Sequence, residues 1–326
     1  MHSKLVQKNF SIMAKTNSLP IFEYGMVWED PISGHRVGCL DVSRKEDVAR
    51  LMKDEKAVLA VQDPPYNVGI NAEFGNLPLD RYMNWSEKWV DNTLNILHDN
   101  SSFYIWLGAD VRSGLQPLPD FILMMRDKPV KIRSFITMRN QRGYGTQKNW
   151  MAVRQELLYY IKGEPFFDVQ AEYTDIPKKT KGYYKKINGK MTENFERSKS
   201  LTIRAGNVWH DIQQVFYLMH ENIEGCFAQK PLKSAKRIIE ASSKVDDLVV
   251  DFFSHSGSTL LQAELSKRRC YTMDINPNYC KITVARLLHQ RRTGETGWGR
   301  LKVLKDGQIL VKDEELLGAP TLLDLT

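Results

Sequence analysis

Several features that mark common protein classes are missing from this sequence. The chain has only four cysteines (Cys39, Cys226, Cys270 and Cys280), and no two of them form a C-x-x-C pair. A disulfide framework or a zinc site is therefore not expected, and the scattered cysteines fit a reducing compartment. No G-x-G-x-x-G fingerprint follows an apolar strand, which argues against a dinucleotide site.

Long apolar runs are also missing. The first thirty residues mix Lys, Gln, Asn and Glu, and they contain no apolar stretch long enough for a signal peptide. Nowhere does the chain approach the roughly 20 apolar residues that a membrane helix needs. No internal repeat is evident. From these absences we expect a soluble, cytoplasmic protein.

The composition that remains is that of a globular, basic protein. The 326 residues are 42% hydrophobic, which is ordinary for a folded domain, and they suffice for one large α/β domain with insertions or two small domains. Lys and Arg outnumber Asp and Glu by 46 to 39, for a net charge of +7. This surplus favours a polyanionic partner such as nucleic acid, although many unrelated proteins are equally basic.

Two apolar runs are typical of buried parallel strands, and each leads directly into a loop of unusual composition. Residues 57–61 (AVLAV) precede Gln62-Asp63-Pro64-Pro65-Tyr66-Asn67, and residues 248–250 (LVV) precede the loop 251–259 (DFFSHSGST). In open α/β sheets, ligands bind in the crevice at the carboxyl ends of the strands. Both loops therefore stand where a binding site is expected.

Helical periodicity alternates with these strands. Apolar residues at helical spacing predict helices over 85–97, 232–239 and 260–265, while residues 103–107 and 270–273 have the composition of further short strands. Strands that alternate with helices in this way predict a doubly wound, mostly parallel α/β sheet. Beyond Gly297, residues 301–304 and 309–311 flank Asp306-Gly307, a pattern typical of a hairpin.

The alternation breaks between about residues 164 and 205. From Tyr173 to Arg204 there are nine basic residues against three acidic ones, and aromatic residues lie among them. Cations suit phosphates and aromatic rings suit bases, so this segment favours a nucleic-acid surface. A solvated surface insertion would have the same composition. The candidate DNA-binding residues are Lys178, Lys179, Lys181, Lys185 and Lys186.

The loop Asp63-Pro64-Pro65-Tyr66 combines three features that suit a planar ligand with an amino group. The Asp63 carboxylate can accept a hydrogen bond from the amine. Two consecutive prolines stiffen the backbone and remove competing N–H donors, so that a carbonyl is free to accept a second one. Tyr66 provides a flat face for stacking. A Pro-Pro turn that closes a strand, with Asp63 as a cap, is the structural alternative.

These residues resemble the catalytic motif of the amino-methyltransferases that modify DNA at adenine N6 or cytosine N4. Residues 227–232 (FAQKPL) resemble the stretch that precedes the cofactor loop in that family, residues 251–259 resemble its D-P-F-x-G-S-G-T-T cofactor loop, and residues 274–279 (DINPNY) resemble its acidic segment. Residues 155–160 and 207–212 are also similar to family segments. The resemblance covers roughly residues 35–290, and the order of its motifs is that of the β group.

The resemblance implies S-adenosyl-L-methionine as the cofactor and a Rossmann-like methyltransferase fold. The start of the helix after the cofactor loop suits the carboxylate of the methionine moiety, Lys230 adds positive charge, and Asp274 is placed to bind two ribose hydroxyls. A surface lysine and a helix cap are the structural alternatives for Lys230 and Asp274. The implied cofactor-binding residues are Gln229, Lys230, Pro231, Asp251, Phe253, Ser254, His255, Ser256, Gly257, Ser258, Thr259, Asp274, Ile275 and Asn276. No metal ligand is implied.

The sequence departs from the family pattern at three positions. His255 occupies the place of the first glycine of G-S-G, and Phe252 replaces a proline. A histidine carries a side chain where glycine allows close approach and positive φ, so the loop could be wider or the cofactor affinity lower. A catalytic role for His255 is a further possibility. Gly38 stands where the family has an acid that faces the cofactor's adenine.

We therefore predict a methyltransferase that acts on adenine N6 of a base flipped out of double-stranded DNA. Direct in-line transfer is expected, because none of the four cysteines follows a proline as the nucleophile of carbon-5 methylation does. The predicted organisation is an N-terminal extension (1–34), the catalytic half (35–163), a target-recognition insertion (164–205), the cofactor-binding half (206–292) and a C-terminal extension (293–326). The catalytic residues would be Asp63, Pro64, Pro65 and Tyr66.

Three alternatives remain open. Cytosine N4 is the nearest, because an Asp at position 63 is only more common in the adenine branch. A DNA-binding subunit with weak activity is the second, given the altered cofactor loop, and an RNA substrate is the third. A homodimer and a cognate restriction endonuclease are possible partners.

Overall fold

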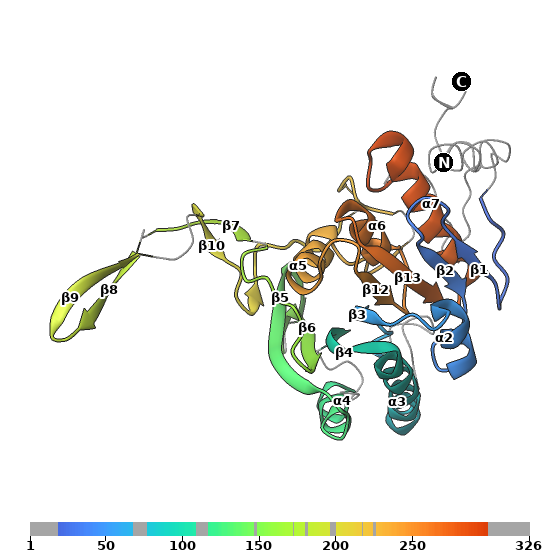
Figure 1. The fold of residues 1–326 in the computed structure, drawn as a ribbon, viewed down its shortest axis with the longest axis horizontal. Coiled ribbons are helices and arrows are strands. Elements are labelled where there is room, and N and C mark those ends of the chain that lie inside the picture. Colours follow the sequence, from blue (N-terminus) through green and yellow to red (C-terminus); the bar gives the residue numbers. More distant parts are fainter. Residues whose placement is uncertain are drawn as a thin grey trace.

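The computed structural model describes residues 19–67, 77–108, 117–146, 149–171, 173–179, 182–195, 200–216, 218–223 and 226–298. In these residues a nine-stranded sheet forms the centre of the molecule, in the order β1-β2-β13-β12-β3-β4-β6-β5-β11 (Figure 1). Its strands are β1 (Val27–Glu29), β2 (Arg36–Cys39), β3 (Ala57–Gln62), β4 (Leu97–Leu107), β5 (Lys131–Thr146), β6 (Asn149–Lys162), β11 (Val208–Trp209), β12 (Leu248–Asp251) and β13 (Arg269–Asp274).

The middle of the sheet is parallel. Strands β2, β13, β12, β3 and β4 run in one direction, whereas β1 and β6 are antiparallel to their neighbours β2 and β4. Strands β3 and β12 are adjacent, with Leu59 opposite Val249 and Ala60 opposite Val250. The loops that follow them therefore leave the same edge of the sheet. The predicted doubly wound, mostly parallel sheet is confirmed.

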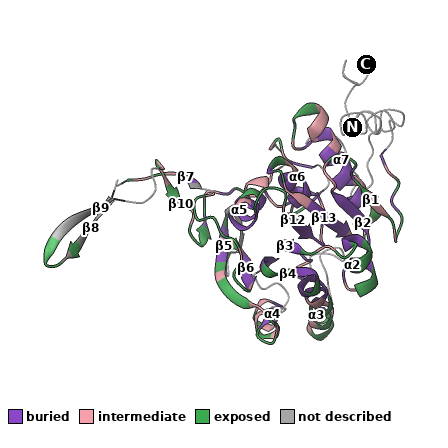
Figure 2. Ribbon diagram, viewed as in Figure 1, coloured by how far each residue is buried: buried purple, intermediate pink, exposed green. Residues whose placement is uncertain are grey.

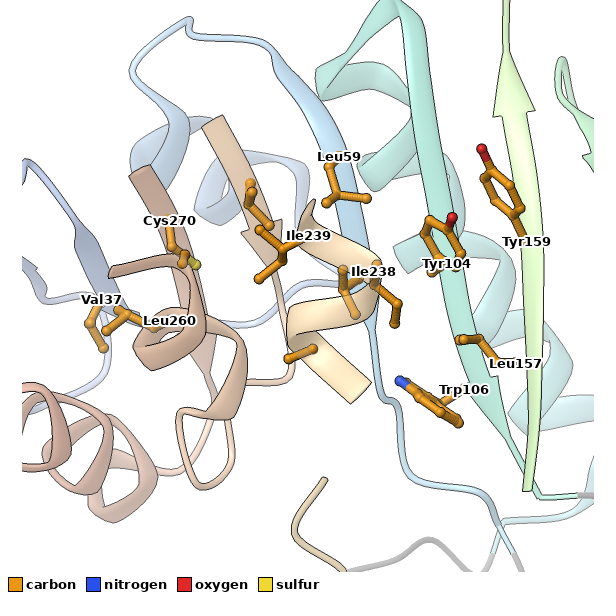
Figure 3. Close-up of a cluster of buried hydrophobic side chains, with 14 of the residues drawn as sticks. Val37, Leu59, Tyr104, Trp106, Leu157, Tyr159, Ile238, Ile239, Leu260 and Cys270 are labelled. Atoms are coloured by element: carbon orange, nitrogen blue, oxygen red, sulfur yellow. The ribbon is translucent and has the colours of Figure 1, made fainter. Parts of the chain in front are cut away.

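Helices cover both faces of the sheet (Figure 1). Helices α5 (Leu232–Ser242), α6 (Ser258–Leu265) and α7 (Pro277–Thr293) pack on one face, against strand residues such as Leu59 and Tyr104 (Figure 3). Helices α2 (Lys45–Met52), α3 (Leu79–Ile96) and α4 (Pro117–Met125) pack on the other, against Phe103 and Ile105. The strands between these two layers are buried on both sides, which explains their continuous apolar runs (Figure 2).

Predicted elements and observed elements agree in type and differ at their ends. The predicted helices correspond to α3, α5 and α6, and the predicted strands to β3, β4, β12 and β13. Helix α3 ends at Ile96, and β4 begins at once with Leu97, six residues before the predicted strand. The extra residues include polar His98, Asp99 and Asn100, and a register shift interrupts their pairing with β3. Because these side chains are exposed and polar, the apolar pattern did not predict this part of the strand.

The basic segment forms small sheets of its own. Strand β7 (Tyr173–Pro177) pairs with β10 (Thr202–Arg204), and β8 (Gly182–Ile187) pairs with β9 (Lys190–Phe195) in a hairpin that projects from the main body (Figure 1). Asn188 and Gly189 form its two-residue turn, both with positive φ (50° and 81°). Asn-Gly is the usual sequence of such a turn, so this hairpin could have been read from the sequence.

Some expectations fall outside the described residues. The predicted C-terminal hairpin lies beyond residue 298, as does most of the predicted C-terminal extension, and residues 1–18 of the N-terminal extension are likewise not described. Within the described part of the chain, no helix combines the length and apolar character needed to cross a membrane.

A buried ion pair ties the edge strand β11 to helix α5. The Arg237 guanidinium donates to both carboxylate oxygens of Asp211, at 3.1 and 2.7 Å, and lies over the ring of Trp209. Burial opposes ionisation of Asp211, but the hydrogen bonds from Arg237 and Lys233 outweigh it and hold the pKa of this carboxyl below its ordinary value. The pair therefore fixes the point at which the chain returns from the basic segment to the sheet.

Removing one member of this pair is expected to destabilise the fold. Arg237→Met leaves the Asp211 carboxylate buried with only Lys233 beside it, and we expect a loss of about 3–5 kcal/mol in unfolding free energy. Replacing both residues, as Arg237→Met with Asp211→Leu, should recover much of that loss. Urea unfolding followed by circular dichroism measures both. A single variant as stable as the wild type would contradict a structural role for the pair.

Candidate functional site

The loop after β3 presents its carboxylate and its ring to one another. Asp63 is about one-quarter exposed, and its Oδ1 accepts a hydrogen bond from the Tyr66 hydroxyl at 3.0 Å. Burial and the Asp63 carboxylate raise the pKa of Tyr66, so its hydroxyl stays protonated and can donate. The Tyr82 hydroxyl, from α3, donates to the Pro65 carbonyl at 2.8 Å. The predicted catalytic residues are thus held as one unit.

Lys230, just before α5, packs against the loop that follows β3. Its Nζ donates to Asp63 Oδ2 at 2.8 Å, and the ammonium lies 5.1 Å from the centre of the Tyr66 ring and 5.4 Å from that of Trp106. Its own carbonyl accepts a hydrogen bond from Ser258 Oγ, on the cofactor loop, at 2.9 Å. Lys230 therefore connects the two loops that follow β3 and β12.

The cofactor loop, which follows β12, is held by the carboxylate at the end of the neighbouring strand β13. Asp274, which ends β13, accepts the backbone N–H of His255 on Oδ2 at 3.0 Å and that of Asn276 on Oδ1 at 2.9 Å. The helix cap considered for Asp274 is not present, because Asn276 caps α7 and Asp274 instead accepts N–H groups from the loops on either side. Helix α6 begins at Ser258 after Gly257, whose φ is +71°. A Cβ at Gly257 would lie only 3.0 Å from the backbone of Thr283, so glycine is needed there.

Asp251, which ends β12 directly before the cofactor loop, is a buried carboxylate. Burial raises its pKa to about 7, while hydrogen bonds from Thr259 and from the Phe253 N–H partly oppose the shift, and the charges of Asp63 and Asp274 add to it. The carboxyl is therefore present in both its protonated and its ionised form near neutral pH. A carboxyl with this property in a cleft is a frequent sign of a functional site.

His255 adopts a backbone conformation that favours glycine. Its φ is +43°, in the left-handed region, and its ring packs edge-on against Tyr279 at 4.6 Å. Burial lowers the pKa of His255 to about 4, so the ring is neutral at physiological pH. Its Nε2 is buried and has no hydrogen-bond partner among the described residues. A ligand in the adjoining cavity could supply that partner.

The two loops share one cavity. Its empty space, including the open mouth, measures about 410 Å³. Its walls come from β3, β4, α5 and the cofactor loop: Val61, Asp63, Trp106, Lys230, Ser234, Ala235, Ile238, Asp251, Phe253, Ser254, His255, Ser256, Ser258 and Thr259. Carboxylates, an ammonium, a helix start and the His255 imidazole fit a polar, charged cofactor such as the predicted one.

Other predicted site residues lie around this cavity. The Gln229 side chain bridges the Ile223 N–H and the Glu221 carbonyl, and Pro231 precedes α5 as its N-cap. The Asn276 side chain caps α7 through the Asn278 N–H, and the Ile275 side chain is exposed. These four shape the loops rather than the walls of the cavity.

The lysines chosen for DNA binding are set apart from the cavity. Lys179 and Lys186 are exposed, and Lys178 is half-buried beside β7. Lys186 is on the projecting hairpin, as is Lys185, whose side chain is not described, and Lys181 lies outside the described residues. No contact among the described residues tests their role.

Sequence reasoning did not identify Trp106 and Arg286 as residues of the site, nor Val61, Ser234, Ala235 and Ile238 of the cavity wall. Trp106 ends a buried strand beside Asp63, and its position at a strand's carboxyl end was the available signal. Arg286, on α7, is fully buried, and it donates to the Ser256 carbonyl at 2.8 Å and to Ser258 Oγ at 3.0 Å. Burial lowers its pKa to about 10, and a charged residue within the apolar run of α7 was the signal for it.

Comparison with known proteins agrees with this geometry. A family model described as DNA methylase, of the N6/N4 type, matches residues 58–285, more than half of the chain. Among curated relatives, the Type II methyltransferase M.HpaI of Haemophilus parainfluenzae is 25% identical over 72% of this chain and 69% of its own length. The DNA adenine methyltransferase YhdJ of Escherichia coli is 28% identical over 72% of this chain and 76% of its own length. The chain spans only 63% of the Type II methyltransferase M.BamHI of Bacillus amyloliquefaciens, at 24% identity over 85% of this chain.

Solved structures share the fold. The cytosine-N4-specific PvuII DNA methyltransferase aligns with a TM-score of 0.53 and 18% identity, over 71% of this chain and 79% of its own. The TTHA0409 protein of Thermus thermophilus, complexed with S-adenosyl-L-methionine, aligns with a TM-score of 0.51 and 19% identity, over 80% and 96%. The predicted Rossmann-like methyltransferase fold is confirmed. With the family model matching both strand-end loops and the segment between them, the chain belongs to the N6/N4 family of DNA methylases.

Proposed function

We propose that this protein transfers a methyl group from S-adenosyl-L-methionine to adenine N6 of a base flipped out of double-stranded DNA. The observation that carries the proposal is the placement of Asp63, beside the Tyr66 ring, in the same cavity as the cofactor loop. Membership of the DNA methylase family supports the reaction type. The choice of adenine N6 over cytosine N4 as the methylated amine rests on separate grounds.

The cofactor end of the cavity suits this donor. S-adenosyl-L-methionine supplies a methyl group activated by its sulfonium. Asp274 would bind the ribose hydroxyls, the start of α6 with Ser256, Ser258 and Thr259 would bind the methionine carboxylate, and Asp251 would face the donor's positive charges. His255 Nε2 adds a neutral hydrogen-bonding group that the family's glycine lacks.

The target end suits an exocyclic amine. Its lone pair is delocalised into the ring, and acceptors on both N–H bonds draw it out of conjugation. Asp63 would accept one bond and the Pro64 carbonyl the other, since the Pro65 carbonyl already accepts from Tyr82. Stacking on Tyr66, at roughly 1–3 kcal/mol per base, offsets the few kcal/mol that base flipping costs.

Adenine is favoured over cytosine on two grounds. An aspartate at position 63 is more common in the adenine branch of the family, and one relative is named a DNA adenine methyltransferase. The cytosine-N4 specificity of the PvuII enzyme keeps cytosine N4 as the second candidate. Incubation with labelled cofactor and unmethylated DNA, followed by nucleoside analysis, decides between them: N6-methyladenine supports the proposal and N4-methylcytosine refutes it.

DNA binding would use the basic segment of residues 164–205 as a target-recognition region. The lysines of this segment, Lys178, Lys179, Lys181, Lys185 and Lys186, are suited to phosphates. Relatives named Type II methyltransferases support a role in restriction-modification, with a cognate endonuclease as partner. A homodimer remains part of this proposal.

The first prediction concerns the acceptor carboxylate. Asp63→Ala should reduce methyl transfer by at least about a hundredfold, because the target amine loses a preorganised charged acceptor, while binding of S-adenosylhomocysteine is not weakened. Asp99→Ala removes an exposed carboxylate far from the cavity and serves as the control. Single-turnover methylation and calorimetry provide the two readouts. An Asp63→Ala enzyme with near-normal turnover would refute the site.

The second prediction concerns the ribose acid. Asp274→Asn keeps an oxygen that can cap a backbone N–H but removes the charge, so S-adenosylhomocysteine affinity should fall by about 10- to 150-fold, as for hydrogen bonds to a charged group. Calorimetric titration measures the change, and the melting temperature checks the loop. Equal affinities would limit Asp274 to holding the backbone N–H groups of His255 and Asn276.

The third prediction uses the raised pKa of Asp251. Below pH 7 the free protein holds this carboxyl protonated. A positively charged donor favours the ionised form, so affinity for S-adenosylmethionine should rise as pH increases towards 7 and then level off. Titrations from about pH 5.5 to 8.5, which bracket the shifted pKa, should show this rise in the wild type and a flatter profile in Asp251→Asn. A profile that is the same in both proteins would exclude Asp251 as its source.

A further inference from the structure

Lys230 occupies the place that the proposed target base would need. Its ammonium is bonded to Asp63 Oδ2 at 2.8 Å, while Tyr66 donates to Oδ1 at 3.0 Å, so both oxygens of the acceptor carboxylate are engaged. The same ammonium lies over the face of the Tyr66 ring. A base could neither bond to Asp63 nor stack on Tyr66 from that side until Lys230 moved.

Lys230 also lies close to the place where the cofactor would bind. Its side chain lines the cavity together with Ser256, Ser258 and Thr259, and its carbonyl is bonded to Ser258 Oγ at the start of α6. Its side chain is only about one-tenth exposed, so water screens its charge weakly. A carboxylate that enters at the start of α6 would therefore compete with Asp63 for this ammonium.

We propose that Lys230 is a positioning residue shared between Asp63 and the carboxylate of the methyl donor. Without the donor, Lys230 holds Asp63 and covers the Tyr66 ring. When the donor binds, its carboxylate draws the ammonium away, and the acceptor and the ring become available to the base. Donor binding therefore precedes base capture. This inference rests on the proposed function, because it takes the donor and the target from it.

The competition has a consequence that does not require DNA. If Asp63 and the donor carboxylate compete for one ammonium, then removing the charge of Asp63 should strengthen donor binding, since Lys230 no longer has to leave a partner. By linkage, binding of the donor must weaken the ion pair of Lys230 with Asp63 by the same free energy. The effect must vanish when Lys230 is replaced, and also for a ligand without a carboxylate.

The test is a double-mutant cycle on ligand binding. Calorimetry would measure the affinity of S-adenosylhomocysteine, which has the carboxylate but no sulfonium charge, for wild type, Asp63→Asn, Lys230→Met and the double variant. We expect Asp63→Asn to bind about fivefold or more tightly than wild type, the lower end of typical coupling between sites. In the Lys230→Met background the same change should have less than about a twofold effect. 5′-Methylthioadenosine, which lacks the amino-acid moiety, should show no tightening in either background.

Two further variants control the experiment. Lys236→Met removes the same charge from an exposed position of α5 and should leave the cycle unchanged. Lys230→Arg keeps the charge and should restore part of the coupling, and thermal melts confirm that each variant is folded. Lys230→Gln replaces Lys230→Met if the latter does not fold.

The outcomes separate the inference from the proposed function. Weaker or equal binding by Asp63→Asn, or the same tightening with Lys230 absent, would overturn the shared role of Lys230 while leaving the methyltransferase intact. A wild-type protein that does not bind S-adenosylhomocysteine at all would instead refute the proposed cofactor. Tightening that depends on both Lys230 and the ligand carboxylate supports the inference.

Discussion

The parallel pairing of β3 with β12 is the constraint on which the rest of the site depends. The two strands are separated by about 190 positions in the chain, yet Leu59 lies opposite Val249 and their loops leave the sheet at the same edge. Gln62 Oε1 accepts the Phe252 N–H at 2.9 Å, which fixes the two strand ends relative to one another. A slip in register would break this hydrogen bond and shift the polar residues at the strand ends, Gln62 and Asp251, against apolar neighbours.

Charge is arranged around this edge so that few groups are left uncompensated. Asp63 forms an ion pair with Lys230, and Asp274 accepts hydrogen bonds from backbone N–H groups. The raised pKa of Asp251 leaves this buried carboxyl partly protonated near neutral pH. Arg286 brings a buried cation beneath the cofactor loop, where carbonyl and hydroxyl oxygens accept its hydrogens. Within the part of the chain that the structure describes, the buried Nε2 of His255 has no hydrogen-bond partner, and His255 lines the cavity. Such an arrangement favours a ligand that carries both signs of charge.

His255 departs from the family's motif yet holds a backbone conformation that glycine adopts most easily. Glycine is favoured at this position of the family's loop because positive φ costs it nothing. The histidine keeps a φ of +43°, and its ring packs on Tyr279 while its N–H binds Asp274. Packing and hydrogen bonding thus stabilise a conformation that the side chain disfavours. The substitution adds a nitrogen to the cavity wall at the cost of this local strain.

The sequence by itself determined the central strands β3, β4, β12 and β13, the helices α3, α5 and α6, and the residue types at the strand ends. Local periodicity encodes buried strands such as Ala57–Gln62, and the order of motifs identified Asp63 and Asp274 without any knowledge of their neighbours. Only the tertiary structure decided what these groups touch. Lys230 was expected beside the cofactor loop, and its ammonium lies against Asp63, 167 positions away. Trp106 joined the site from a strand predicted for its apolar character, and Arg286 from helix α7, which the sequence analysis did not predict. Contacts of this kind depend on which strands become neighbours and how side chains share a cavity, and no local pattern contains that information.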